Sequence, residues 1–235
     1  MSSAKEGFIH RLFDTISPGY DLFNRVASLG LDRGWRRRTI EGLNLLPGMR
    51  VLDLASGTGD LAAESALKML PLGTVAACDL SLPMLRSASV KLSRHPAAGW
   101  HLRFVQGRAE QLPFPPARFD AATIGFALRN VSSLEGTFRE LRRTVRSGGR
   151  IALLEFGRPG NPFLRLGHWL WLTFALPVLG LLTTGKIGPF LYLRRSILGF
   201  LSPGEVVRLL ESAGFSQVKT QRLSGGIVTL YQAAA

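Results

Sequence analysis

The stretch that decides the fold is V51-L-D-L-A-S-G-T-G-D-L-A62. An apolar run typical of a strand leads into a turn with two glycines, and a segment with helical periodicity follows. Glycines at a strand-to-helix turn allow a ligand close to the backbone, because no Cβ stands in its way. The candidate ligand-binding residues of this stretch are Asp53, Ser56, Gly57, Thr58 and Gly59.

A second carboxylate supports this interpretation. Asp79 comes twenty residues after Gly59, near the end of the apolar run 74–80. At the end of a second strand, a carboxylate can accept hydrogen bonds from both hydroxyls of a ribose. A nucleoside ligand is therefore expected, with Asp79 and Leu80 among its contacts.

The glycines alone do not distinguish S-adenosylmethionine from a nicotinamide dinucleotide, since 57–62 also fits the G-x-G-x-x-A variant of a dinucleotide site. Asp60 opposes that alternative, because a pyrophosphate at a helix N-terminus needs N–H groups and no negative charge. Asp53 adds further negative potential. S-adenosylmethionine has no phosphate and carries a sulfonium and an ammonium group, so acidic residues favour it over NAD.

The remaining pattern alternates strands and helices. Such alternation predicts a mostly parallel sheet with right-handed crossovers. A hairpin signal at 224–226 predicts an antiparallel last strand, and 147–149 predicts a turn. The expected strands are 50–54, 74–80, 102–105, 119–126, 150–156, 217–223 and 227–232, and the expected helices are 60–70, a segment after Pro83, 134–145 and 203–213.

This pattern predicts one α/β domain over 1–235, of Rossmann-like type with a seven-stranded sheet. Its expected parts are an N-terminal helical cap (1–46), a cofactor-binding core (47–158), an apolar insertion (159–200) and a final helix with a hairpin (201–235).

Composition excludes several classes of protein. The single cysteine, Cys78, excludes a disulfide framework and disfavours a metal site, so no metal is expected. The net charge of +13 raises the possibility of nucleic-acid binding. The arginines are scattered and not interleaved with aromatic residues, so no nucleic-acid partner is expected. An anionic membrane surface explains the charge equally well.

The apolar insertion contains twenty residues, 166–185, without a charged side chain. That length can span a bilayer. His168, Pro177 and Gly180 argue against spanning, and a segment in the membrane interface or covering a ligand is favoured. Trp169, Trp171 and Phe174 then line a tunnel or lie at the bilayer interface, while burial in an ordinary core is the competing interpretation.

Several motifs together are more specific than the glycine turn. They are Tyr20-Asp21, Trp35, Phe126-Ala-Leu-Arg-Asn130 and Tyr192-Leu-Arg-Arg-Ser-Ile197. With these motifs the chain resembles, over nearly its whole length, the C-methyltransferases of menaquinone and ubiquinone biosynthesis, which are class I S-adenosylmethionine-dependent enzymes.

The resemblance implies that Gly57, Thr58 and Gly59 wrap the methionine part of the cofactor and that Asp79 holds the ribose. The chain departs from the family pattern at two positions: Arg108 stands where Asn or Asp is usual, and Gly125 stands where Ser is usual. The further cofactor contacts that the resemblance implies are Tyr20, Arg108, Ala109, Gly125 and Phe126.

The implied reaction is methylation of a ring carbon of a polyprenylated quinol. Arg129, with Asn130 beside it, is the candidate catalytic group, as a phenolate stabiliser or through a bound water, because arginine is too basic to accept a proton itself. A surface salt bridge is the alternative for Arg129. His10 and His168 are alternative candidates for a base. Neither has a partner visible in the sequence, so both are interpreted as structural residues, His168 as part of the apolar lid. The candidate substrate-binding residues are Trp35, Trp169, Trp171, Phe174 and Tyr192.

Two alternative functions stay open at this point: a methyltransferase for another apolar acceptor, such as a sterol, lipid or aromatic natural product, and an inactive membrane-associated binding protein. A cytoplasmic location, peripheral on the inner face of the cytoplasmic membrane, is expected, and so is a homodimer.

Overall fold

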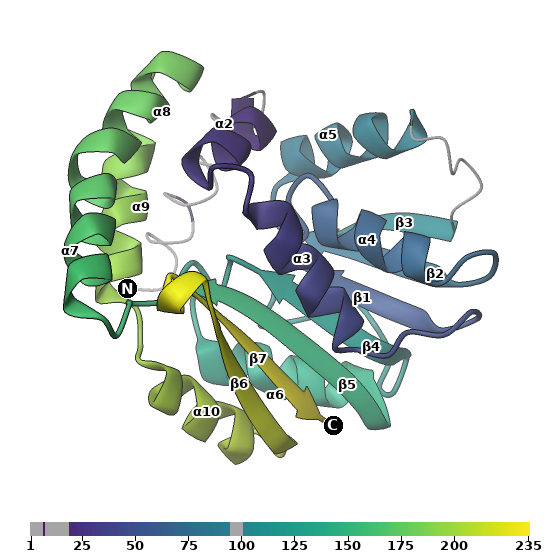
Figure 1. Cartoon of the computed structure of the whole chain (residues 1–235). Helices are drawn as coiled ribbons and strands as arrows, with labels where there is room; N and C mark the ends of the chain where they lie inside the picture. The colour runs from purple at the N-terminus through teal and green to yellow at the C-terminus, as the bar shows by residue number, and fades with distance from the viewer. Residues whose placement is uncertain (1–6, 8–18, 95–100) are drawn as a thin grey trace.

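The computed structural model describes residues 7, 19–94 and 101–235 (Figure 1). His10 and the first part of the predicted N-terminal cap lie outside these residues. Seven strands form one sheet in the order β3-β2-β1-β4-β5-β7-β6. Strands β1 to β5 are parallel, and β7 runs antiparallel between β5 and β6, as predicted. The strands are β1 (Arg50–Leu54), β2 (Thr74–Asp79), β3 (His101–Gln106), β4 (Phe119–Gly125), β5 (Val145–Phe156), β6 (Ser216–Leu223) and β7 (Val228–Ala234).

Helices cover both faces of this sheet (Figure 1). On one face lie α3 (Asp32–Glu41), α4 (Asp60–Lys68) and α5 (Leu82–Ser93), and on the other lie α6 (Leu134–Thr144) and α10 (Pro203–Ser212). The central strands are buried along nearly their whole length, as expected for parallel strands covered on two sides. Serine side chains cap α5, α6 and α10, and Ser202 with Glu205 forms a full capping box.

The apolar insertion forms a third helical layer beside the sheet (Figure 1). Helix α7 (Pro162–Leu170), a π-helical turn (Trp171–Ala175) and α8 (Leu176–Thr184) follow each other without a break, and α9 (Gly188–Gly199) packs against them. Among the described residues, 162–184 is the one helix long and apolar enough to cross a bilayer; 22% of its most apolar window is buried. On its inner side, Leu172 packs in one apolar cluster with Phe23 of α2 (Tyr20–Ala27) and Phe190 of α9.

The predicted turn at 147–149 is wrong. These residues belong to β5, where Val145 pairs with Phe119 and Arg150 pairs with Ala121. The extra residues form a bulge in β5. The strand continues through it because Ala235 exchanges backbone hydrogen bonds with Gly148 and Gly149.

The strand order reverses direction between β1 and β4. In open α/β sheets, ligands bind at the carboxyl ends of the strands where this reversal occurs. The glycine turn after β1 and the Phe126–Asn130 segment after β4 both lie at that edge.

Candidate active site

The turn after β1 has the backbone that its glycines predict. Gly57 has a φ of +53°, and a Cβ built on it would meet nothing within 4 Å. Gly59 has a φ of +82° at the start of α4, and a Cβ there would lie 3.0 Å from Leu92 Cδ1. Gly57 therefore keeps its open side for a ligand, whereas Gly59 lets α5 pack against the turn.

Asp79 holds this turn in place. Its Oδ2 accepts a hydrogen bond from the Gly57 N–H at 2.8 Å, and its Oδ1 accepts one from the Ser81 N–H at 2.8 Å. Its side chain lines a cavity at the carboxyl ends of β1, β2 and β4.

We call this the glycine-turn cavity. Eight of the predicted cofactor contacts line it: Tyr20 comes from α2, and the other seven come from the carboxyl ends of β1 to β4 and the segments after them. They are Tyr20, Gly57, Asp79, Leu80, Arg108, Ala109, Gly125 and Phe126. The cavity also includes Met84 and Glu110, which the sequence did not single out.

Four other predicted contacts, Asp53, Ser56, Thr58 and Gly59, do not line the cavity. Asp53 is 1% exposed and accepts a hydrogen bond from the Thr123 hydroxyl at 2.8 Å. Burial raises the pKa of Asp53 to about 7, against the opposing effect of Thr123. Its carboxyl is thus only about half ionised at neutral pH. It supplies less negative potential than the sequence suggested.

Asp60 is also neutralised more than the sequence suggested. Its carboxylate lies 2.7 Å from Lys91 Nζ and 3.2 Å from an Arg36 nitrogen. Burial acts to raise the pKa of Asp60, but these two cations outweigh it and lower the pKa. Neither Asp53 nor Asp60 therefore presents a bare charge to a ligand, and of the three aspartates only Asp79 lines the cavity.

The same cations fasten the N-terminal helices to the turn. Lys91 bridges Asp60 and Asp21, the latter at 2.8 Å. Asp21 also accepts a hydrogen bond from the Thr58 hydroxyl at 2.5 Å. The Tyr20-Asp21 pair thus connects α2 to the glycine turn, which brings Tyr20 over the cavity.

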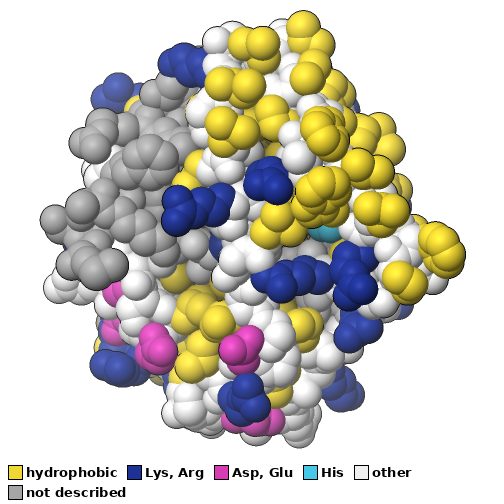
Figure 2. All heavy atoms as spheres, turned by 90° about the vertical axis from the view of Figure 1, so that its left-hand side faces the viewer, with side chains coloured by type: hydrophobic (Ala, Val, Ile, Leu, Met, Phe, Trp, Pro, Cys, Tyr) yellow, Lys and Arg dark blue, Asp and Glu magenta, His cyan; other side chains and the backbone are white. Residues whose placement is uncertain are grey.

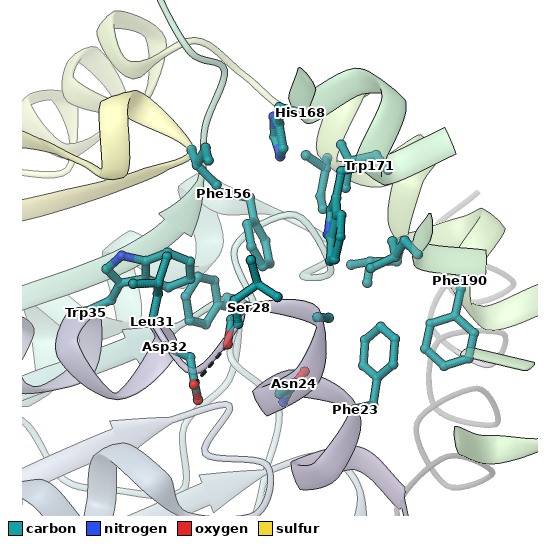
Figure 3. Close-up of a pocket in the computed structure, with 18 of the residues that line it drawn as sticks. Phe23, Asn24, Ser28, Leu31, Asp32, Trp35, Phe156, His168, Trp171 and Phe190 are labelled. Carbon is teal, nitrogen blue, oxygen red and sulfur yellow. Dashed lines mark hydrogen bonds between the residues drawn. The ribbon is translucent and has the colours of Figure 1, made fainter. Parts of the chain in front are cut away.

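A second, larger hollow, the aromatic cavity, has a volume of about 340 Å³. Small-molecule sites typically measure about 300–1,000 Å³. Figure 3 shows Trp35, Phe156 and Trp171 around this hollow, with Phe23 and Phe190 near one end and His168 of α7 at another. Tyr20, Phe126 and Asn130 line both cavities, so the two hollows meet at these three residues.

Arg129 lies beside this junction and lines the aromatic cavity. Its Nη1 donates to Glu155 Oε1 at 2.7 Å and to the Phe126 carbonyl at 2.5 Å. The side chains of Arg129 and Glu155 are 5% and 0% exposed. The ion pair is buried, so the alternative of a surface salt bridge is wrong.

Glu155 fixes the arginine more firmly than one contact would. Its Oε2 accepts from the Arg129 backbone N–H at 3.2 Å, and its Oε1 accepts from the Phe156 N–H at 2.8 Å. Arg129 Nε is buried and has no hydrogen-bond partner among the described residues. The guanidinium is therefore held in place through Nη1, while its Nε–H has no partner among the described residues. Glu155 could not be predicted from the sequence, because its position in an apolar strand did not indicate which way the side chain points.

The other predicted polar residues gather at the junction. The Tyr192 hydroxyl donates to Asn130 Oδ1 at 3.1 Å. Burial raises the pKa values of Tyr20 and Tyr192, so both phenols are protonated at neutral pH. His168 lines the aromatic cavity, and burial lowers its pKa, which favours a neutral imidazole.

The predicted aromatic residues separate into two groups. Trp35 and Trp171 line the aromatic cavity, and the Trp35 indole N–H donates to the Ser224 hydroxyl at 2.9 Å. Trp169 and Phe174 do not line it and are 40% and 61% exposed. The cavity lining therefore does not support the tunnel interpretation for these two residues, whose exposure leaves the interpretation of a bilayer interface as a prediction.

Comparison with known proteins identifies the family. The model of the ubiE/COQ5 methyltransferase family matches residues 1–235. A demethylmenaquinone methyltransferase of Roseiflexus castenholzii is 40% identical, over 94% of this chain and 90% of that protein. A ubiquinone/menaquinone biosynthesis C-methyltransferase of Ectopseudomonas mendocina is 38% identical, over 98% and 90%.

Solved structures share the fold at low identity. A SAM-dependent methyltransferase from Aquifex aeolicus superposes with a TM-score of 0.62 at 18% identity, over 84% of this chain and 88% of that one. The [4+2]-cyclase SpnF gives 0.69 at 15% identity, over 96% and 95%. Because a cyclase shares this fold, the fold alone does not decide the reaction. Sequence similarity along the full length decides the family: the chain belongs to the ubiE/COQ5 methyltransferases.

Proposed function

We propose that this enzyme transfers a methyl group from S-adenosylmethionine to a ring carbon of a polyprenylated quinol. The observation that carries the proposal is the junction of two cavities at Tyr20, Phe126 and Asn130, with Arg129 beside it. One cavity has polar groups suited to a nucleoside, and the other is apolar and large enough for a quinol ring. The names of the related enzymes support a quinone precursor as the acceptor.

The glycine-turn cavity fits S-adenosylmethionine. The Asp79 carboxylate lines this cavity, where it can accept hydrogen bonds from the ribose hydroxyls, and a Cβ on Gly57 would meet nothing within 4 Å. Leu80, Arg108, Ala109 and Gly125 would complete the contacts. When bound, the cofactor supplies an electrophilic methyl group on a sulfonium.

The chain's own residues would prepare the acceptor. A ring carbon becomes nucleophilic when the adjacent hydroxyl gives its proton to one bound water, and a nearby cation stabilises the resulting phenolate. Once the carbon has gained the methyl group, it would release its hydrogen as a proton to the same water, and the ring would become aromatic again. Arg129 is suited to this role, since Glu155 holds it in place and its Nε–H lacks a partner among the described residues. Asn130, held by Tyr192, would position the acceptor at the junction. The apolar walls of the aromatic cavity would exclude bulk water from the reacting groups.

Location follows from the acceptor. A polyprenyl chain partitions into the bilayer, so we propose that the enzyme works as a peripheral protein at the inner face of the cytoplasmic membrane. The predicted homodimer stays a prediction.

The test is turnover with two soluble, short-tailed acceptors, a demethylmenaquinol and the benzoquinol precursor of ubiquinone, each with methyl-labelled S-adenosylmethionine. Labelled carbon-bound methyl in either product supports the proposal, and the ratio of rates identifies the ring. Calorimetric binding of S-adenosylmethionine without transfer to either acceptor would refute the quinol assignment. Absence of binding would instead favour an inactive binding protein, and binding of NAD in its place would refute the choice of cofactor.

A further inference from the structure

The outer side of the insertion is an apolar surface without a covering element in the described part of the chain. More than half of the exposed large hydrophobic side chains of the described residues lie on helices α7 to α9 and the segments between them. We call the outer side of 162–195 the insertion face. Its exposed apolar residues are Phe163, Leu164, Leu166, Trp169, Leu170, Phe174, Val178, Leu181, Leu182, Ile187 and Leu191.

The charge of this region has one sign. Between Glu155 and Glu205 the chain contains five basic residues and no Asp or Glu: Arg158, Arg165, Lys186, Arg194 and Arg195. Figure 2 shows hydrophobic side chains over this side of the molecule, basic side chains next to them, and acidic side chains only lower down. An apolar surface bordered by cations complements an anionic lipid surface, which offers hydrocarbon between phosphate groups.

Helix α7 and the π-helical turn after it form a wall of the aromatic cavity. Gly167, His168 and Trp171 line the cavity, while Leu166 and Leu170 on neighbouring positions are exposed. Helix α7 thus separates the cavity from the surroundings by the thickness of one helix.

The rim of the cavity is apolar and exposed. Phe163 and Leu164 line the cavity and are 83% and 49% exposed. Leu29 and Leu31, between α2 and α3, also line it and are 74% and 49% exposed. Exposed hydrophobic side chains around an apolar cavity are unfavourable in water and favourable in contact with lipid.

We propose that the insertion face lies on an anionic bilayer and that the quinol enters the aromatic cavity directly from the lipid, between Leu29 and Leu31 on one side and Phe163 and Leu164 on the other. This inference rests on the proposed function for the identity of the acceptor. Helix 162–184 lies along the membrane and does not cross it, because Leu172 and Leu176 on its inner side are buried against Phe23 and Phe190.

A second copy of the chain is a weaker occupant of this face. Two such faces in a symmetric dimer would bring basic residues together, and the region has no acidic residue to pair with them. Anionic lipid removes that repulsion, and each basic residue near the surface strengthens binding by about fivefold.

The test is binding of the full chain to vesicles of phosphatidylcholine with and without phosphatidylglycerol. The variant is L166D/L182D, whose parent side chains are 56% and 76% exposed and line neither cavity. The control is L46D/L72D, which introduces the same two charges at residues 60% and 61% exposed outside the insertion face.

We expect binding to phosphatidylglycerol vesicles to fall at least tenfold in L166D/L182D and less than twofold in the control. Turnover of a long-tailed acceptor in vesicles should fall in parallel, while turnover of a soluble short-tailed acceptor stays unchanged. Equal vesicle binding by all three proteins would overturn the proposal. So would a dimer of the parent that L166D/L182D converts to a monomer in lipid-free buffer.

The two proposals can fail separately. If the soluble acceptor is not methylated by the parent, the proposed function fails whatever the vesicles show. If it is methylated and the vesicle-bound acceptor is used equally by parent and variant, the docking surface fails alone.

Discussion

Replacing Glu155 by Gln tests whether a buried carboxylate holds the proposed catalytic arginine. Glu155 is fully buried and accepts three hydrogen bonds, two from Arg129 and one from the Phe156 N–H. Glutamine has nearly the same volume but no charge. One of its terminal groups is a donor, which would face a donor of Arg129 or Phe156.

The expected loss of stability in E155Q follows from the burial of both Glu155 and Arg129. Removing one member of a buried ion pair typically costs about 3–5 kcal/mol, because the other charge remains in a place that water does not reach. We therefore expect E155Q to lower the free energy of unfolding by about 3 kcal/mol in a urea titration. The matched control is E41Q, which removes the carboxylate of an exposed pair, with Arg38 at 3.6 Å. The Glu41 and Arg38 side chains are 49% and 56% exposed, so a cost of about 1 kcal/mol or less is expected.

Activity separates a positioning role from a structural one. In E155Q the guanidinium loses its fixed orientation, so we expect kcat to fall by about tenfold or more at temperatures where the variant is folded. The KM for S-adenosylmethionine should stay within about twofold, because Glu155 does not line the glycine-turn cavity. The double variant R129M/E155L should regain most of the stability, since both charges are gone, and none of the activity. A stable, fully active E155Q, or an active R129M/E155L, would refute the reasoning.

Three further predictions concern residues on the strands around the glycine turn. D79N should weaken calorimetric binding of S-adenosylmethionine by about tenfold to a hundredfold, because hydrogen bonds to a charged acceptor contribute about 1.5–3 kcal/mol; unchanged affinity would contradict the ribose role. Burial raises the pKa of Asp53 to about 7, so the folded state binds more protons than the unfolded state between about pH 4 and 7. The parent should lose stability as the pH rises through this window and D53N should lose less, which urea titrations at both ends would measure. G125A should cost about 1 kcal/mol, because its Cβ would lie 2.7 Å from Leu61 Cδ1 and the buried leucine must turn away; an unchanged melting temperature would contradict this.

Local patterns predicted the elements of the sheet well, because its central strands are covered on two faces and read as continuous apolar runs. The stretch at 147–149 was misread since two adjacent glycines normally end a strand. Here pairing with the C-terminal residue Ala235 keeps the strand intact through a bulge. Such pairing between residues far apart in the chain is not visible in a local pattern.

Site residues that belong to a sequence motif were predicted, whereas residues that pair with them from other parts of the chain were not. Gly57, Asp79 and Arg129 lie near the cavities as expected. Lys91 and Glu155, which neutralise Asp60 and hold Arg129, carry no motif of their own. Asp53 and Asp60 therefore favour S-adenosylmethionine over NAD less than predicted, and of the three aspartates Asp79 is the one that lines the cavity.

Phe126 explains why the two cavities meet where they do. Its φ of +57° lies in the left-handed region, which costs a residue with a side chain about 1–2 kcal/mol. Several contacts hold it there: its N–H donates to the Leu154 carbonyl at 2.6 Å, its carbonyl accepts from Arg129, and its ring contacts Trp35 and Phe156. This conformation turns the ring into the aromatic cavity, while the neighbouring Gly125 faces the glycine-turn cavity. Phe126 thus forms part of the boundary between the proposed cofactor and acceptor sites. Its carbonyl also accepts a hydrogen bond from Arg129, and this bond holds the guanidinium beside the boundary.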